Sequence, residues 1–220
     1  MPTILNPPLE IPAGLVFNAR KFEPAHFQQI TPGGRGFLQT IERSRPWWIA
    51  EYSTPPLNND RYNEATAFFD ELQGAMESFL AYDPRRPMPH AYRTLPTSFD
   101  PWTQVGQTAP RVTAYDYNAS TLTLDRMADT AVVTKGDYIS FLIGYKWYLF
   151  RATETGAAAA NTITIKVKPR PSLEGTLPVN IRYRRACCQM KLLGRPEESD
   201  SVDSNPSFIF RAVQFVDRSV

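Results

Sequence analysis

Thr162-Ile-Thr-Ile-Lys-Val-Lys168 alternates polar and apolar residues over seven positions, and Val179-Asn-Ile-Arg-Tyr-Arg184 repeats the pattern shortly afterwards. Strict alternation of this kind is typical of a β-strand with one buried and one solvated face. Further strand-like runs occupy residues 120–125, 137–143, 145–151, 189–193 and 208–215, with turn residues between them. This spacing predicts a mainly β sandwich or barrel, and of the two we expect an antiparallel β-sandwich with long Pro-rich loops.

One segment departs from this pattern and predicts a single α-helix around residues 60–73. Asn58-Asn59-Asp60 supplies side chains that cap a helix N-terminus. An apolar stripe at helical spacing follows, formed by Ala65, Phe68, Phe69 and Leu72. Gly74 suits the left-handed position just past a helix end, so we expect a strand to follow over residues 76–82.

The region before the helix predicts two strands. Phe37–Arg43 and Trp47–Tyr52 are both strand-like, and Ser44-Arg45-Pro46 interrupts them. We expect the two runs to form an antiparallel pair with each other.

Prolines divide the chain. The 20 prolines outnumber the 11 glycines, and they cluster in stretches that cannot be central strands. We therefore expect an extended N-terminal arm over residues 1–20, a β-sandwich domain over 21–82 and 119–220, and a Pro-rich excursion over 83–118. The arm and the excursion supply the candidate inter-subunit or partner contacts, which are Ile4, Leu5, Leu9, Arg85, Arg86, Phe99 and Trp102.

The bulk properties exclude several classes of protein. A net charge of +2 from 24 basic and 22 acidic residues lacks the basic excess of a nucleic-acid binder. No run of about 18 apolar residues and no signal-peptide pattern is found, so we expect synthesis in the cytoplasm without membrane insertion. The adjacent Cys187 and Cys188 would form a strained disulfide, which favours a reducing compartment.

Groups suited to catalysis are scarce. His26, His90 and the Cys pair match no metal-ligand spacing, and no nucleophile elbow, zincin or P-loop motif occurs. The 22 acidic residues could supply a glycosidase-like carboxylate pair, but nothing in the sequence singles out two of them. We therefore expect neither an enzyme nor a bound metal or cofactor.

Two patterns suggest surfaces. Lys166 and Lys168, with Arg182 and Arg184, would form a cationic stripe if their strands were neighbours, although a solvated outer face is the simpler explanation. The aromatic residues could form a sugar-stacking platform or belong to a core or interface; they are Trp47, Trp48, Trp102, Trp147 and Tyr148.

The order of several short segments resembles the distal tail proteins of long-tailed phages and gene-transfer agents. The first part of the resemblance comprises Trp48–Tyr52, then Ala67-Phe-Phe-Asp-Glu-Leu-Gln-Gly74, then Phe79–Pro84. The second part comprises Lys135-Gly-Asp-Tyr138, Tyr148-Leu-Phe-Arg151, Thr162–Pro169, Met190-Lys-Leu192 and Phe208–Val213. Together the segments cover about two-thirds of the chain; residues 1–12 and 83–118 fit no part of the family pattern.

This resemblance implies a virion structural protein with a belt-type β-sandwich, assembled as a hexameric ring at the tip of the tail tube. The implied partners are the tail tube protein, the baseplate hub or tail fibre, and the tape-measure protein, with DNA only as cargo passing through the lumen. The alternative from another class is a carbohydrate-binding β-sandwich module that recognises host glycans through Trp147 or Trp102.

Overall fold

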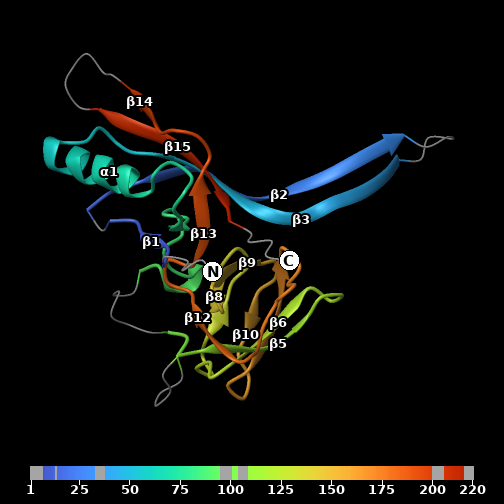
Figure 1. Cartoon of the computed structure of the whole chain (residues 1–220). Helices are drawn as coiled ribbons and strands as arrows, with labels where there is room; N and C mark the ends of the chain where they lie inside the picture. The colour runs from blue at the N-terminus through green and yellow to red at the C-terminus, as the bar shows by residue number, and fades with distance from the viewer. Residues whose placement is uncertain are drawn as a thin grey trace, which may run out of the picture.

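The computed structural model describes residues 7–12, 14–32, 38–94, 101–103, 109–199 and 206–215. They form two β lobes, a sheet lobe that carries the α-helix and a barrel lobe (Figure 1). The sheet lobe is built from chain segments that lie before and after the barrel in sequence. The barrel is therefore an insertion within the sheet lobe.

The sheet lobe contains seven strands, and every pairing except β1 with β4 is antiparallel. Across the sheet the order is β1 (Leu9–Glu10), β4 (Phe79–Tyr82), β13 (Cys187–Leu192), β15 (Ser207–Gln214), β3 (Leu38–Ser53) and β2 (Asn18–Pro32). The short strand β14 (Glu197–Ser199) pairs with β15 outside this order.

Helix α1 (Asn59–Glu71) packs its predicted apolar stripe against the sheet. The side chain of Asn58 caps the helix by accepting a hydrogen bond from the Arg61 N–H at 3.0 Å. Past the helix, Gln73 and Gly74 have φ values of 46° and 70°, so the chain turns in the left-handed region. The helix is where the sequence predicts it, but the following strand begins only at Phe79, because residues 72–76 are a turn.

Six strands close the barrel lobe. Around the barrel they are β11 (Ile163–Lys168), β6 (Thr121–Asp125), β5 (Arg111–Asp116), β12 (Val179–Arg182), β8 (Tyr138–Ile143) and β9 (Lys146–Ala152). A two-stranded pair, β7 (Val132–Val133) and β10 (Gly156–Ala157), lies beside them. In β11 the alternation gives the expected result: Ile163, Ile165 and Val167 are buried while the residues between them are exposed.

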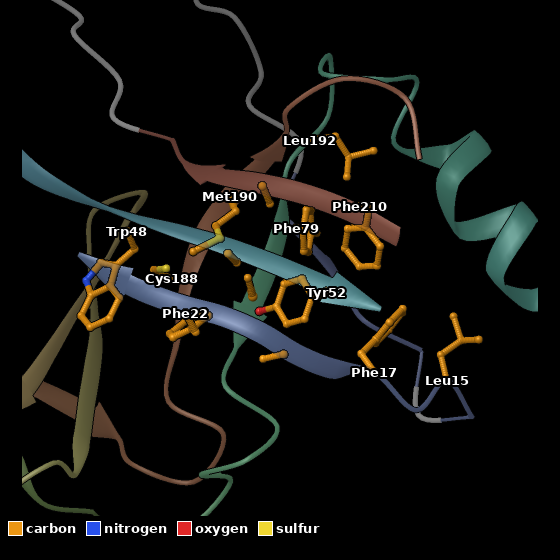
Figure 2. Close-up of a cluster of buried hydrophobic side chains, with 14 of the residues drawn as sticks. Leu15, Phe17, Phe22, Trp48, Tyr52, Phe79, Cys188, Met190, Leu192 and Phe210 are labelled. Carbon is orange, nitrogen blue, oxygen red and sulfur yellow. The ribbon is translucent and has the colours of Figure 1, made fainter. Parts of the chain in front are cut away.

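Each lobe has its own hydrophobic core. In the sheet lobe, aromatic and sulfur-containing side chains from several strands project into one cluster (Figure 2). The barrel core gathers residues from 102 to 183. The two cores meet where Trp48 donates its indole N–H to the Leu149 carbonyl oxygen at 2.9 Å and Phe22 packs edge-on to Tyr138 at 5.8 Å.

The mainly β, antiparallel fold with one α-helix is confirmed among the described residues. The sequence grouped residues 21–82 and 119–220 in one sandwich, whereas in the structure residues 111–182 close into a barrel with its own core. The predicted 83–118 excursion also ends earlier, because Arg111–Asp116 forms β5. Alternation predicts which residues are buried in a strand, but it does not encode which strands pair.

The expected pairing of residues 37–43 with 47–52 is wrong. Residues 38–43 and 47–52 belong to the single strand β3, and its partner over both runs is β2. The register between β2 and β3 shifts around Phe27, so two residues of β3, Arg45 and Pro46, are absorbed as an irregularity. A proline is tolerated within a sheet at such a position, where it need not donate to the ladder.

Candidate functional site: a cationic groove between the lobes

Two adjoining cavities of about 410 and 430 Å³ lie where the lobes meet, and we call them together the cationic groove. Arg86, Arg93, Tyr138 and Arg151 line both cavities. The groove is basic because seven cationic side chains line it against three acidic ones. The cations are Arg20, Lys21, Arg85, Arg86, Arg93, Lys135 and Arg151, and the acids are Glu23, Asp83 and Asp137.

The three carboxylates are already bound within the chain. Asp83, whose side chain is 1% exposed, accepts two hydrogen bonds from the Arg85 guanidinium, at 2.9 Å from Nε to Oδ1 and 3.1 Å from Nη2 to Oδ2. This hydrogen bond raises the pKa of Arg85. At the rim of the groove Glu23 pairs with Lys21 at 3.0 Å. Asp83 and Arg85 therefore act together as a fixed, nearly neutral support for the groove.

Asp137 fixes the chain segment that forms one wall of the groove. Its buried carboxylate accepts the backbone N–H of His90 at 2.7 Å and that of Thr134 at 2.8 Å. Burial raises the pKa of Asp137, and the two backbone hydrogen bonds partly oppose this rise. The short 3₁₀ helix η2 (His90–Tyr92) is thereby attached to the barrel lobe, and the Tyr92 hydroxyl adds a bond by accepting the Val132 N–H at 2.9 Å.

Several cations remain available to a ligand. Within the described part of the chain, the side chains of Arg20, Arg93, Lys135 and Arg151 form no ion pair, and the first three are exposed. Arg86 donates to the Gly136 carbonyl oxygen at 3.1 Å and lies over the Tyr138 ring. Guanidinium groups bind carboxylates and phosphates in a bidentate way, so the groove is suited to an anionic partner.

The predicted contact residues are divided between the groove and the lobe cores. Arg85 and Arg86 line the groove. Leu9 belongs to β1 and packs on the core of the sheet lobe. Trp102 is fully buried in the barrel, stacked on Tyr183 at 4.5 Å, and donates to the Val132 carbonyl oxygen at 3.2 Å. The remaining three, Ile4, Leu5 and Phe99, lie outside the described residues.

The predicted cationic stripe does not form. Lys166 and Lys168 lie on β11 and Arg182 lies on β12, and two strands separate β11 from β12 in both directions around the barrel. Arg182 is instead paired with Glu10 at 3.1 Å and lies over the Trp147 ring at 5.8 Å. Arg184 follows β12 in a turn, with its guanidinium near the Tyr183 ring. The prediction required neighbouring strands, and sequence order does not determine neighbours in a closed barrel.

The aromatic residues do not form one platform. Trp48 and Trp102 are completely buried in the two separate cores, so neither exposes a ring face on which a sugar could stack. Trp47, Trp147 and Tyr148 are half-buried, and the Trp147 ring faces the Arg182 guanidinium.

The cysteine thiols are both free and buried. Burial raises the pKa of Cys187 to about 11, and it also raises the pKa of Cys188 well above its usual value. Cys188 lies in the sheet-lobe core, whereas the Cys187 N–H donates to the Ser140 hydroxyl of the barrel. Both thiols are protonated at neutral pH and are poor nucleophiles.

Sequence reasoning missed most of the groove. Arg20, Lys21, Arg93, Lys135 and Arg151 come from four segments spread over more than 130 residues, so no local charge cluster marks them. Pairing of β2 with β3 and closure of the barrel bring them together. Only the order of the strands in the sheet and the barrel would have indicated that these five cations lie together.

The chain matches no protein-family model and no curated protein. Among the described residues, no cluster of three His, Cys, Asp or Glu side chains could hold a metal ion. No helix of the described chain is long and apolar enough to span a membrane.

Proposed function

We propose that this chain is a non-enzymatic structural subunit of a phage virion, forming a ring at the distal end of the tail tube and connecting it to the baseplate hub or tail fibre. The observation that carries the proposal is the outer part of the β2–β3 hairpin, residues 27–32 and 38–44, which we call the ribbon. It extends away from both lobes (Figure 1). The resemblance described above supports the same role.

The two strands of the ribbon leave unpaired edges on which a partner can bind. β3 pairs with β15 only over Ile49–Ser53, so over the ribbon β2 and β3 pair only with each other. Six residues of extended chain reach about 20 Å beyond the sheet. A two-stranded hairpin is at best marginally stable alone in water, and its unpaired edges can add further strands.

The ribbon also exposes apolar side chains. Phe27 is 39% exposed and Ile41 is 51% exposed, although neither contributes to a lobe core. Phe27 packs against Trp47 at 4.6 Å, which makes an aromatic pair at the base of the ribbon. Covering these groups on neighbouring subunits would stabilise an assembly at about 25 cal/mol per Å² of apolar surface buried.

A ring follows from such a contact if successive copies close upon one another. The ribbon of one copy would contact a different surface on the next, which is a heterologous interface, and such interfaces close into rings or continue as filaments. We expect six copies, with the tail tube protein on one side, the hub on the other, and the tape-measure protein and passing DNA within the lumen.

The proposal is tested by imaging. Negative-stain images of the purified chain should show rings of about six subunits, and gold-labelled antibody against the chain should mark the tail tip of intact particles. The double variant Phe27→Asp with Ile41→Asp should lose the rings while its thermal unfolding midpoint stays unchanged. Tyr145→Asp, at a 79% exposed residue of the β8–β9 turn, is the matched control and should still form rings.

The labelling of intact phage particles decides more than images of the purified chain, because some ring subunits assemble only on their partner. Absence of label from the tail tip, together with a monomeric chain in solution, would refute the proposed role. A monomeric chain that bound host glycans would support the carbohydrate-binding alternative.

A further inference from the structure

The charge of this chain is distributed unevenly. Of its 24 basic and 22 acidic residues, seven basic and three acidic line the cationic groove, which leaves 17 basic against 19 acidic elsewhere. The near-neutral total therefore hides a basic region and an acidic remainder. Each region is a possible recognition surface for the other sign of charge.

The elements α1 and β14 together carry six acidic residues and one cation, Arg61, and we call the six carboxylates the acidic end. It consists of Asp60, Glu64, Asp70 and Glu71 on α1 and Glu197 and Glu198 on β14. Both elements flank Phe208: the Tyr62 ring of α1 stacks on it at 5.5 Å, and Glu198 lies opposite it in the β14–β15 ladder. Within the described chain none of these six carboxylates forms an ion pair.

We infer that the cationic groove of one copy binds the acidic end of a second copy of this chain. The inference rests on the proposed function, because it names the contact that orders successive subunits. No residue of the acidic end lines the groove. Figure 1 shows α1 and β14 at the far end of the sheet lobe from the barrel, so a chain does not satisfy its own groove.

Two unlike surfaces on one chain give a head-to-tail interface. Such an interface lets every copy use both its groove and its acidic end, except at the ends of an open chain. Charge complementarity of this kind fixes orientation and accelerates encounter more than it adds affinity. The ribbon would then supply apolar burial while the charges select the direction of assembly.

The lining of the groove favours a polypeptide over a nucleic acid. Sites for single-stranded nucleic acid use aromatic faces on which bases stack. The phenylalanine and tyrosine rings that line the groove belong to Phe22, Tyr138 and Tyr183, and all three are no more than 7% exposed, which leaves the His90 imidazole as the one exposed ring of the lining.

A charge-swap experiment tests the inference. The groove variant Arg20→Glu with Arg93→Glu and the acidic-end variant Glu197→Lys with Glu198→Lys change only exposed side chains. Each should weaken self-association at least tenfold in sedimentation velocity at 150 mM salt. Combining all four substitutions should restore self-association to within threefold of the original chain. The matched control is Lys166→Glu with Lys168→Glu, which reverses two exposed cations on β11 outside the groove and should change nothing.

A second measurement separates the failure of this inference from failure of the ring. Fluorescence anisotropy with a labelled hexaglutamate peptide should show binding to the original chain and loss of binding in the groove variant. If the chain forms rings and the groove variant self-associates normally, the inference is overturned while the proposed function stands.

If the chain never assembles but the groove still binds hexaglutamate, the proposed ring is refuted and the groove remains a site for acidic segments of another protein. Binding of a labelled dT12 oligonucleotide that the groove variant abolishes, with self-association unchanged, would assign the groove to nucleic acid instead.

Discussion

Adjacent tryptophans occupy opposite environments in this molecule. Trp48 is fully buried and hydrogen-bonded to the barrel, whereas Trp47 is half-buried and packs on Phe27 at the base of the ribbon. Neighbouring residues of a strand point to opposite faces, so one residue supports the lobe junction and the next packs on the ribbon.

We expect Trp48→Ala to lower the free energy of unfolding by about 3–5 kcal/mol, because it leaves a large cavity at the junction. It also leaves the Leu149 carbonyl oxygen without the indole donor. Urea unfolding followed by far-UV circular dichroism measures the change. Trp47→Ala is the matched control, and an equal loss in both variants would contradict this account of Trp48.

The buried thiol of Cys187 makes stability depend on alkaline pH. In the unfolded chain a thiol loses its proton near pH 8.5, whereas burial keeps the folded thiol protonated to about pH 11. The contribution is therefore fully present below the unfolded pKa and is lost as pH rises through the folded one. The free energy of unfolding that is lost between these two pKa values is about 3 kcal/mol.

We expect Cys187→Ala to flatten the decline of unfolding free energy between pH 8.5 and 11. Cys188, Tyr52 and Tyr138 also have raised pKa values and contribute their own declines, so the difference between variant and original chain isolates Cys187. Urea titrations at half-unit pH intervals provide the measurement. If the free energy of unfolding fell with pH in the same way for the variant and the original chain, Cys187 would have the same pKa in the folded and unfolded states.

At the scale of elements, the ribbon is separable from the fold. Its strands form a ladder only with each other, and none of its side chains that the structure describes belongs to either core. Replacing residues 27–44 by a two-residue Asn-Gly turn should leave a folded chain, because this dipeptide suits the tight turn of a hairpin.

We expect this shortened chain to unfold with a free energy within about 1 kcal/mol of the original, because a two-stranded hairpin is only marginally stable and adds little to the fold. Ring formation should be abolished. Sedimentation velocity measures the assembly and urea unfolding measures the stability. Rings formed by the shortened chain would locate the subunit contact elsewhere.

Local elements could be predicted from the sequence where the determining signal is itself local. The Asn58 cap and Gly74 bound α1, and alternation in β11 gives its buried face. The division of β3 at Pro46 failed because a sheet can absorb a proline at a bulge, which depends on the partner strand.

At the scale of the whole molecule, an aromatic contact helps to couple the lobes, beside the hydrogen bonds from Trp48 to Leu149 and from Cys187 to Ser140. Tyr138 belongs to the barrel, yet its ring packs on Phe22 and Trp48 of the sheet lobe at 5.8 and 5.7 Å. Its hydroxyl also donates to the Asp83 carboxylate at 3.4 Å. This contact and the Asp83–Arg85 pair together fix the groove between the lobes.

We expect Tyr138→Ala to uncouple the lobes, so that urea unfolding becomes biphasic. Tryptophan fluorescence and far-UV circular dichroism should then give different midpoints, which is the usual sign that two-state behaviour is lost. Tyr115→Ala, at a 41% exposed residue of β5, should retain one coincident transition. Coincident transitions in both variants would indicate that other contacts couple the lobes.

The cationic groove could not be predicted, because its residues come together only when the whole chain is folded. Of its seven cations, sequence reasoning singled out Arg85 and Arg86, which are adjacent in a Pro-rich stretch. The others are brought together by long-range strand pairing, and the predicted stripe failed for the same reason.

The insertion of the barrel between β4 and β13 has a consequence for synthesis on the ribosome. The barrel strands, Arg111 to Arg182, emerge as one continuous stretch and can pair as soon as they are made. β3 must wait for β15, whose Ile209 pairs with Ser53 across more than 150 residues. Until then the Ile49–Ser53 edge of β3 is open to other nascent chains on the same message, a stage at which unpaired strands are prone to aggregate. The acidic end, which needs β14 and β15, is completed at the same late moment, so the surface that we infer directs assembly becomes available only as the vulnerable edge is closed.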